Sequence, residues 1–361
     1  MVISEIVVRQ LRLPLVKPYR VSFRTYTEFE PVVVEMVAAD GTVGWGEAYV
    51  PAGSTRETAE SAWKFCCEKA AGLAGMHAGD IGSQIDAEVG QSPFAACAML
   101  SALAMVMRHP ALLVGEETRV PLLVPVSATE QGAIAEEIEE RLDQGYRTFK
   151  VKVGWEVDAD LQRVRWVQQA LRGRATITMD ANRGYDVEQG MRFASTLDPE
   201  GILLFEQPCE ADEWEANARV ASVSKVPLML DESIRNENDI KRAATVHGVR
   251  YVKLKLKRVG GVDRALRAMQ QARELGLGIC LGDGVATEIM CWTEACVSRG
   301  FLSGAGDMNG FLKPKAQLLA NPLPFEGGDI VLRPGYWPEV DREVLRAHQT
   351  RESRYAALTP A

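Results

Sequence analysis

The chain has 361 residues, a length that suits about two domains or one barrel-sized domain with an appendage. Charged residues make up 25% and apolar residues 47% of the sequence, which is enough to bury a large core and excludes global disorder. Acidic residues outnumber basic ones by 49 to 41, and a net charge of −8 without long Lys/Arg runs argues against nucleic acid or a membrane as partner. Small molecules are the expected partners.

The cysteines and the apolar runs indicate the compartment. Seven cysteines form no CxxC pair, and their scattered spacing is typical of reduced thiols rather than of disulfides or a zinc site. The first residues carry no secretory signal, and the longest charge-free apolar stretch, 94–107, is too short to cross a bilayer. We therefore expect a soluble, cytoplasmic protein.

The N-terminal third reads as a small α+β module. Strand-like runs are predicted at 6–8, 31–37 and 42–47, with Asp40-Gly41 as a hairpin signal between the last two. Two helical patterns follow, at about 55–72 and 92–108, and His109-Pro110 ends the second because the residue before a proline disfavours the α region. We predict an antiparallel sheet with helices as a capping domain over residues 1–119.

The rhythm changes after residue 120, where apolar strand-like runs alternate with helical patterns. The predicted strands lie at 120–126, 148–153, 175–179, 202–205, 226–230, 251–256, 279–281 and 302–306. Their repeat of about 25 residues indicates an α/β fold with a parallel sheet, and a TIM-type barrel closes eight such strands without an exposed edge. An open doubly wound sheet is the alternative, although no GxGxxG follows the first strand. We predict a barrel over 120–325 and a tail, 326–361, that packs back on the cap.

Three consecutive predicted strands end on an acid: Asp180, Glu206 and Asp231. One such acid is readily explained as a cap of the following helix. Three at intervals of about 25 residues would lie side by side in a barrel mouth, where carboxylates repel one another unless a cation lies among them. Oxygen ligands without His or Cys favour Mg²⁺ over zinc.

Lysines occupy the strands on either side of these acids. Lys150 and Lys152 share one face of their strand, and the outward face would press two charges against helices. We therefore expect both in the mouth. Lys255 shares a face with Lys253 and Lys257, and one of these three is expected to extend to solvent. Strands two and six lie on opposite sides of an eight-stranded barrel, so Lys152 and Lys255 are predicted to face each other as two bases.

Six motifs in order and spacing carry a family resemblance. They are the KxK pair at Lys150 and Lys152, "MDAN" with Asp180 and Asn182, "FEQP" with Glu206, "LDES" with Asp231 and Glu232, "KLKRVGG" from Lys255, and "GWGEA" from Gly44. The chain resembles the enolase superfamily, specifically the muconate-lactonizing subgroup of the mandelate racemase/muconate lactonizing enzyme family. The resemblance covers essentially the whole chain.

The resemblance implies a modified (β/α)7β barrel under a capping domain and removal of the proton α to a substrate carboxylate. It implies Mg²⁺, or alternatively Mn²⁺, on Asp180, Glu206 and Asp231, supported by Asn182 and Glu232. Lys150 would lie near the substrate carboxylate, with Lys152 and Lys255 as acid and base on the two faces of the carbon. Neighbouring cations are expected to lower the pKa of Lys152 toward ~7–8. A homo-oligomer is also implied.

Substrate choice is expected to come from the cap loops and the last two strands. The candidates are Arg20, Arg24 and Tyr26 in a loop at 19–30, a lid at 50–56, and Asp283, Glu288, Asp307 and Asn309. Related dipeptide epimerases carry Asp-x-Asp where this chain has Asp307-Met308-Asn309, and cycloisomerases carry Glu-x-aromatic-Gly. The pair Asp307 and Asn309 suits a neutral or singly cationic nitrogen, such as that of an N-substituted amino acid.

Two opposed bases favour racemisation or epimerisation of an amino-acid-like carboxylate. Syn lactonisation of an unsaturated diacid is the alternative, and a barrel kept only for binding is the alternative from another class. A His–Asp dyad of the mandelate racemase type is disfavoured because none of the four histidines ends a predicted strand.

Overall fold

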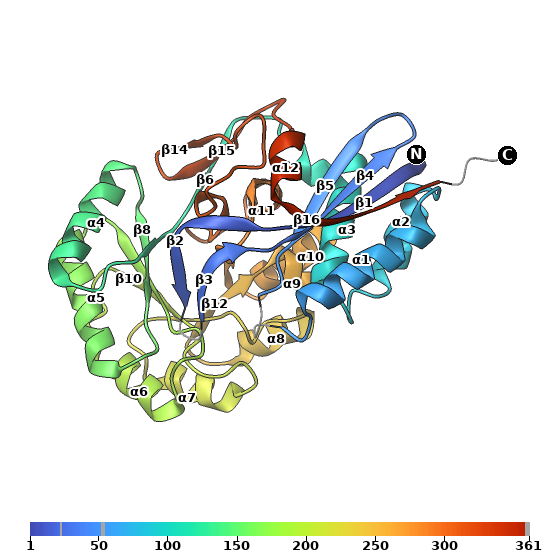
Figure 1. The fold of residues 1–361 in the computed structure, drawn as a ribbon. Helices are drawn as coiled ribbons and strands as arrows, with labels where there is room; N and C mark the ends of the chain where they lie inside the picture. The colour runs from blue at the N-terminus through green and yellow to red at the C-terminus, as the bar shows by residue number, and fades with distance from the viewer. Residues whose placement is uncertain (22–23, 52–54, 358–361) are drawn as a thin grey trace.

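The computed structural model describes residues 1–21, 24–51 and 55–357. An antiparallel sheet with its helices lies beside a curled, seven-stranded parallel sheet (Figure 1). The predicted α/β class, with a barrel-type parallel sheet and an antiparallel N-terminal module, is confirmed. No helix in the described ranges is both long and apolar enough to span a membrane. All seven cysteines are free thiols.

The antiparallel sheet joins both ends of the chain. Its order is β16 (Gln349–Ala356), β1 (Ile3–Leu11), β4 (Val32–Ala38) and β5 (Val43–Ala48). Three helices cover it: α1 (Ala59–Leu73), α2 (Ala78–Asp86) and α3 (Pro93–Val106). Gly44 and Gly46 of β5 let α3 approach closely, because a Cβ at either position would overlap the backbone of α3 at Ala102 or Ala98.

A hairpin replaces the predicted loop at 19–30. Strand β2 (Leu13–Val21) pairs with β3 (Arg24–Phe29), and the two extend from the antiparallel sheet toward the barrel strands (Figure 1). The loop prediction is wrong. Prolines in β2 argue against a strand, but they are tolerated here because β2 pairs with only one neighbour. Of the lid predicted at 50–56, residues 52–54 lie outside the described residues.

The parallel sheet is built from seven strands in sequential order. They are β7 (Val124–Val126), β8 (Thr148–Lys152), β9 (Thr176–Asp180), β10 (Ile202–Glu206), β11 (Leu228–Leu230), β12 (Val249–Leu254) and β13 (Gly278–Leu281). The helices between and after them are α4 (Gln131–Asp143), α5 (Val157–Leu171), α6 (Val187–Thr196), α7 (Trp214–Val223), α8 (Glu237–Thr245), α9 (Leu256–Val259), α10 (Val262–Glu274) and α11 (Glu288–Ser298).

The ends of the predicted barrel differ from expectation. Residues 302–306 form no regular strand; isolated parallel bridges from Gly306 to Leu122 and from Asp307 to Gly282 connect the two edges of the sheet instead. The segment predicted as one strand at 120–126 divides into β6 (Thr118–Pro121) and β7. Strand β6 leaves the barrel and pairs with β15 (Asp329–Leu332), which also pairs with β14 (Phe325–Glu326).

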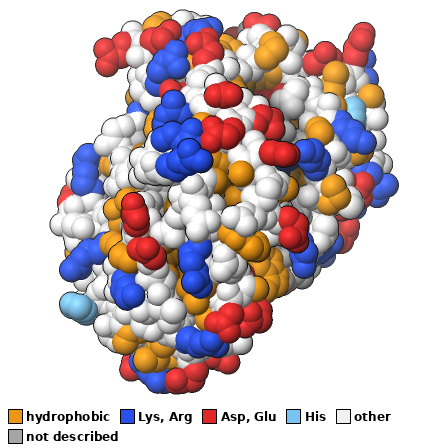
Figure 2. Space-filling model, turned by 90° about the vertical axis from the view of Figure 1, so that its left-hand side faces the viewer, with side chains coloured by type: hydrophobic (Ala, Val, Ile, Leu, Met, Phe, Trp, Pro, Cys, Tyr) orange, Lys and Arg blue, Asp and Glu red, His pale blue; other side chains and the backbone are white. Residues whose placement is uncertain are grey.

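The remaining elements are short. They are η1 (Pro110–Leu112), η2 (Gly310–Leu312) and α12 (Arg342–His348). On the face shown in Figure 2, Lys/Arg and Asp/Glu side chains are interspersed and neither sign forms a continuous patch.

Candidate active site

Three acids lie at the carboxyl ends of three adjacent parallel strands. Asp180 ends β9, Glu206 ends β10 as its register partner, and Asp231 follows β11 directly. Each is about 1% exposed. Buried carboxylates need a counter-charge, because an unpaired charge away from water is costly.

The lysines of β8 supply part of that counter-charge. Lys152 stands opposite Asp180 in the strand register, and its Nζ donates to Asp180 Oδ2 at 2.6 Å and to Asn182 Oδ1 at 2.6 Å. Lys150 Nζ lies 2.8 Å from Asp180 Oδ2 and 2.9 Å from Glu206 Oε2. Both side chains therefore point to the acids, as the two-residue period of a strand requires.

Strand β12 and the residues after it present three more lysines, and each contacts an acid. Lys253 Nζ donates to Glu206 Oε1 at 3.1 Å, Lys255 to Asp231 Oδ2 at 2.9 Å, and Lys257 lies 2.7 Å from Asp283 Oδ2. The expectation that one of the three extends to solvent is wrong. Lys255 keeps an extended backbone beyond the strand, so Lys253 and Lys255 point the same way into the mouth.

Most of these groups, but not Glu206 or Lys257, line one cavity of about 60 Å³. Lys152 and Lys255 both line it, each held by one of the two outer acids, Asp180 and Asp231. Tyr19, Tyr26 and Phe94 cover it from the cap side, and its other lining residues include Lys150, Asn182, Glu232, Lys253, Arg258 and Asp283. Two amines from strands far apart in the sheet thus reach one space.

The electrostatics separate the three acids. Burial opposes ionisation of Asp180, but Lys150 and Lys152 outweigh it and lower its pKa. The pKa of Asp231 is also lowered, since Lys255 and Arg258 outweigh burial. The pKa of Glu206 is raised by burial and by the neighbouring charge of Asp180.

The expected fall in the pKa of Lys152 is not found. Burial, the largest influence, lowers this pKa and Lys150 also lowers it, but the combined attraction of Asp180, Tyr19 and Glu206 outweighs both and the pKa of Lys152 is raised. The expectation weighed the neighbouring cations and not the direct hydrogen bond to Asp180. Burial and the charge of Asp231 raise the pKa of Glu232, which lines the same cavity, to about 7.

The donor chemistry of the mouth fits a hard divalent cation. Asp180, Glu206 and Asp231 offer only carboxylate oxygens, and Glu206 Oε2 is buried and accepts no hydrogen bond. Within the described residues no three His, Cys, Asp or Glu side chains are gathered as ligands of one ion. Lys150 Nζ lies within 2.9 Å of both Asp180 Oδ2 and Glu206 Oε2, so an ion between these oxygens requires that ammonium to give up a contact.

The predicted specificity residues fall into two groups. Tyr26 and Asp283 line the cavity, and the exposed Arg24 stacks 5.2 Å from the ring centroid of Tyr26. Glu288 begins α11 as a buried side chain that accepts from the Leu319 amide at 3.4 Å, away from the cavity. Arg20 stacks on Trp155, 5.6 Å from its ring centroid.

Asp307 and Asn309 are buried and engaged with protein groups. Asp307 Oδ2 accepts from Lys150 at 3.0 Å and from Lys253, and Asp307 Oδ1 accepts from Asn309 Nδ2 at 3.1 Å. Asn309 Oδ1 accepts from Lys313 Nζ at 2.5 Å. Neither residue lines the cavity.

Tyr19, Lys253, Arg258 and Lys313 belong to the site and were not assigned roles from the sequence. Lys253 lies two residues before Lys255, and Arg258 lies three residues after it. Strand alternation by itself places Lys253 on the same face as Lys255. Arg258 Nη1 donates to Asp231 Oδ1 at 2.7 Å. Burial lowers the pKa of Lys313 to about 8, and its Nζ lies 4.8 Å from the ring centroid of Tyr19. No local pattern around Tyr19 or Lys313 indicates that either residue belongs to the site.

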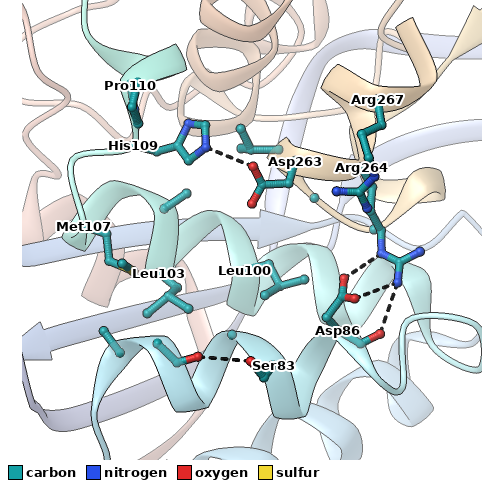
Figure 3. Close-up of a pocket in the computed structure, with 17 residues that line it drawn as sticks. Ser83, Asp86, Leu100, Leu103, Met107, His109, Pro110, Asp263, Arg264 and Arg267 are labelled. Atoms are coloured by element: carbon teal, nitrogen blue, oxygen red, sulfur yellow. Dashed lines mark hydrogen bonds and ion pairs between the residues drawn. The ribbon is translucent and has the colours of Figure 1, made fainter. Parts of the chain in front are cut away.

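A larger hollow of about 460 Å³ lies elsewhere, among α2, α3 and the start of α10 (Figure 3). It shares no lining residue with the barrel-mouth cavity. Four of its charged side chains form two pairs, His109 with Asp263 at 3.0 Å and Arg264 with Asp86 at 2.7 Å, over a floor that includes Leu100 and Leu103. Because these groups form separate pairs rather than one cluster, the larger hollow is a poorer candidate for catalysis than the smaller mouth.

Comparisons with known proteins show the family of the chain. A family model described as enolase C-terminal domain-like matches residues 133–344. The o-succinylbenzoate synthase of Geobacillus kaustophilus is 30% identical over 295 residues, which cover 78% of this chain and 77% of that protein.

Two solved structures share the fold. The N-succinyl Arg/Lys racemase from Bacillus cereus superposes with a TM-score of 0.89 at 24% identity, covering 98% of this chain and 100% of that one. The dipeptide epimerase from Cytophaga hutchinsonii, complexed with Mg and the dipeptide D-Ala-L-Val, has a TM-score of 0.86 at 19% identity, covering 98% and 100%.

Proposed function

The chain belongs to the enolase superfamily and is an enzyme of its mandelate racemase/muconate lactonizing group, and from that premise we propose that it racemises or epimerises an amino-acid-like carboxylate. The observation that carries the proposal is the position of Lys152 and Lys255. Both amines line one cavity, and they come from β8 and from the end of β12, with three acid-ended strands between. Opposed amines suit removal of a proton from one face of a carbon and its return on the other.

Each residue of the mouth has a role in this proposal. Lys152 takes or returns the α-proton on one face, Lys255 does so on the other, and Lys150 lies beside the substrate carboxylate. Asp180, Glu206 and Asp231 would hold Mg²⁺, with Mn²⁺ as an alternative; that ion supplies positive charge for the enediolate oxygens. An amine acts as a base only when neutral, so the contact between Lys152 and Asp180 must weaken when substrate binds.

The far wall of the mouth supports an N-substituted amino acid rather than a free dipeptide. A substrate ammonium needs an uncommitted carboxylate, and Asp307 Oδ2 already accepts from Lys150 and Lys253. Asn309 is likewise held by Lys313. The Bacillus cereus relative named N-succinyl-L-Arg/Lys racemase, 27% identical over 301 residues, acts on a substrate of the N-acylated kind by its name.

A second candidate is loss of water from the same enediolate. The observation that favours it is the 30% identity to the o-succinylbenzoate synthase of Geobacillus kaustophilus over 78% of this chain. The first step, proton abstraction by one of the two lysines, is common to both candidates. Syn lactonisation of an unsaturated diacid, the alternative from the sequence, also uses an enediolate.

An isotope experiment separates these outcomes. The enzyme is incubated in D₂O with Mg²⁺ and N-succinyl amino acids, N-acetyl amino acids, dipeptides, diacids or the hydroxy-acid precursor of o-succinylbenzoate, and products are followed by mass spectrometry. A racemase adds one deuterium at the α carbon without changing the skeleton. Loss of water or ring closure changes the product and marks the other reactions. No deuterium uptake and no product with any of these compounds contradicts enediolate chemistry.

A further inference from the structure

Lys253 is a buried lysine on the strand next to the three acid-ended strands. Its side chain belongs to β12 and is about 1% exposed, which places it among the largest fully buried side chains of the protein. Its Nζ donates to Glu206 Oε1 at 3.1 Å and also to Asp307 Oδ2. A lysine with no access to water retains its charge only where carboxylates surround it.

Lys150 completes the same arrangement from the opposite side. Its Nζ lies 2.9 Å from Glu206 Oε2 and 3.0 Å from Asp307 Oδ2. Glu206 therefore has one ammonium on each carboxylate oxygen, and Asp307 Oδ2 is shared by both ammonium groups. The middle acid of the three has no charge left uncompensated.

The protein itself compensates the acids of the mouth. Four carboxylates, Asp180, Glu206, Asp231 and Asp307, face four ammonium groups, those of Lys150, Lys152, Lys253 and Lys255, and the Arg258 guanidinium also lies on Asp231. A divalent cation that enters such a set adds two positive charges to a cluster whose acids are already paired. Like charges a few ångströms apart in a buried site repel strongly, so each internal ammonium reduces the affinity for the ion.

We propose that Lys253 is a built-in counter-ion for Glu206, which weakens divalent-cation binding at Asp180, Glu206 and Asp231. This inference rests on the proposed metal site. Lys253 does not touch the reacting carbon in this scheme; it sets how much negative charge the three acids present. Removing its charge leaves Glu206 with an uncompensated oxygen and strengthens the attraction for a cation.

The test is a binding titration without substrate. Chelator-treated full-length protein is titrated with MgCl₂ and MnCl₂ by calorimetry, with the metal-induced shift in Tm as a second readout. Lys253→Gln keeps a hydrogen-bond donor and removes the charge, and it should bind Mg²⁺ at least about tenfold more tightly than the parent. Lys253→Arg, which keeps the charge, should stay close to the parent. Lys257→Gln removes an equally buried charge beside Asp283 and should change the affinity less than about threefold.

Removing a carboxylate instead of an ammonium is an independent test, which remains available if Lys253→Gln does not fold. Asp307→Asn removes the carboxylate shared by Lys150 and Lys253, leaves positive charge in excess, and should weaken Mg²⁺ binding at least about tenfold. Unchanged or weaker binding in Lys253→Gln, or unchanged binding in Asp307→Asn, overturns the counter-ion role. If neither parent nor Lys253→Gln binds either cation, the metal site of the proposed function fails together with it; equal binding by both refutes only the role of Lys253.

Discussion

The two sides of the barrel mouth differ in how their charged residues are positioned and paired. On the side formed by β8 to β12, charged side chains stand at alternate positions of regular strands and meet across the register, as Lys152 and Asp180 do. On the side formed by residues 282–313, Asp283, Asp307 and Asn309 stand in irregular segments. Asp283 and Asp307 are each engaged by a lysine distant in sequence, and Asn309 by the nearby Lys313. The lysines of the first side line the cavity, whereas the carboxylates of the second side form ion pairs with lysines of the protein.

This difference shows how the same residue type acquires different roles. Lys255 and Lys257 are two residues apart, yet Lys255 lines the cavity with Asp231 while Lys257 is tied to Asp283 and to the Val285 carbonyl at 3.0 Å. Strand geometry decides the first contact, and the path of the chain after β13 decides the second. The comparison predicts that substitutions on the first side affect chemistry and those on the second affect stability.

The largest expected effect is the loss of proton transfer on the lysine side. Lys152→Ala and Lys255→Ala should each slow α-proton exchange about 10²–10⁴-fold, because each removes a general acid–base. Deuterium uptake by substrate, followed by mass spectrometry, measures this. Lys241→Ala, an exposed lysine of α8, is the matched control and should exchange at the parental rate. Full exchange in either site variant would end the two-base proposal.

On the other side, Asp307→Asn should act on stability. Two buried ammonium groups lose their shared carboxylate, and breaking a buried pair in this way costs about 3–5 kcal/mol of unfolding free energy. Calorimetric Tm without added metal checks it, with the exposed Asp263→Asn as a control that should leave Tm nearly unchanged. If Asp307→Asn instead raised KM and left Tm unaltered, Asp307 would contact the substrate. The two sides would then not differ in this way.

A pH-dependent prediction concerns Glu294 of α11, behind the second side. Among the described residues it forms no ion pair, and burial together with Asp283 raises its pKa from 4.5 to about 8. The unfolded chain ionises this group above about 4.5 while the folded protein keeps the proton, so this contribution to stability is present at low pH and is lost as pH rises through about 8.

Glu294→Gln removes that dependence. The variant should be more stable than the parent by about 4 kcal/mol near pH 8, and the gain should vanish near pH 4.5. Unfolding curves of both proteins across this range measure it. A gain that is constant with pH would mean that Glu294 is ionised in the folded protein.

The smallest effect is expected at the cap hairpin. Arg24 is exposed and lies 5.2 Å from the Tyr26 ring centroid, so Arg24→Ala removes a contact worth about 0.5–1 kcal/mol. Because Tyr26 lines the cavity, we expect KM to rise about two- to fivefold with kcat unchanged, whereas Arg12→Ala, which removes contacts to Glu28 and Glu30, should leave both constant. A loss of kcat in Arg24→Ala would assign the hairpin a part in the chemistry itself.

Much of the fold follows from local pattern. Apolar runs at a regular spacing predict the parallel strands, because a strand buried on both faces is apolar throughout and must alternate with helices. The same pattern places Asp180, Glu206 and Asp231 at one edge of the sheet. The hairpin β2–β3 was missed because its prolines argue against a strand, and the last barrel strand was predicted where the chain forms only isolated bridges.

The sequence by itself determined the family, the parallel sheet and the set of acids and lysines at the strand ends, since all of these depend on residues near one another along the chain. Only the tertiary structure decided which ammonium meets which carboxylate. Lys253 with Asp307, Lys150 with Asp307 and Tyr19 over the cavity join segments that are far apart in sequence. Such contacts are set by how strands and loops pack in three dimensions, and no local periodicity encodes them.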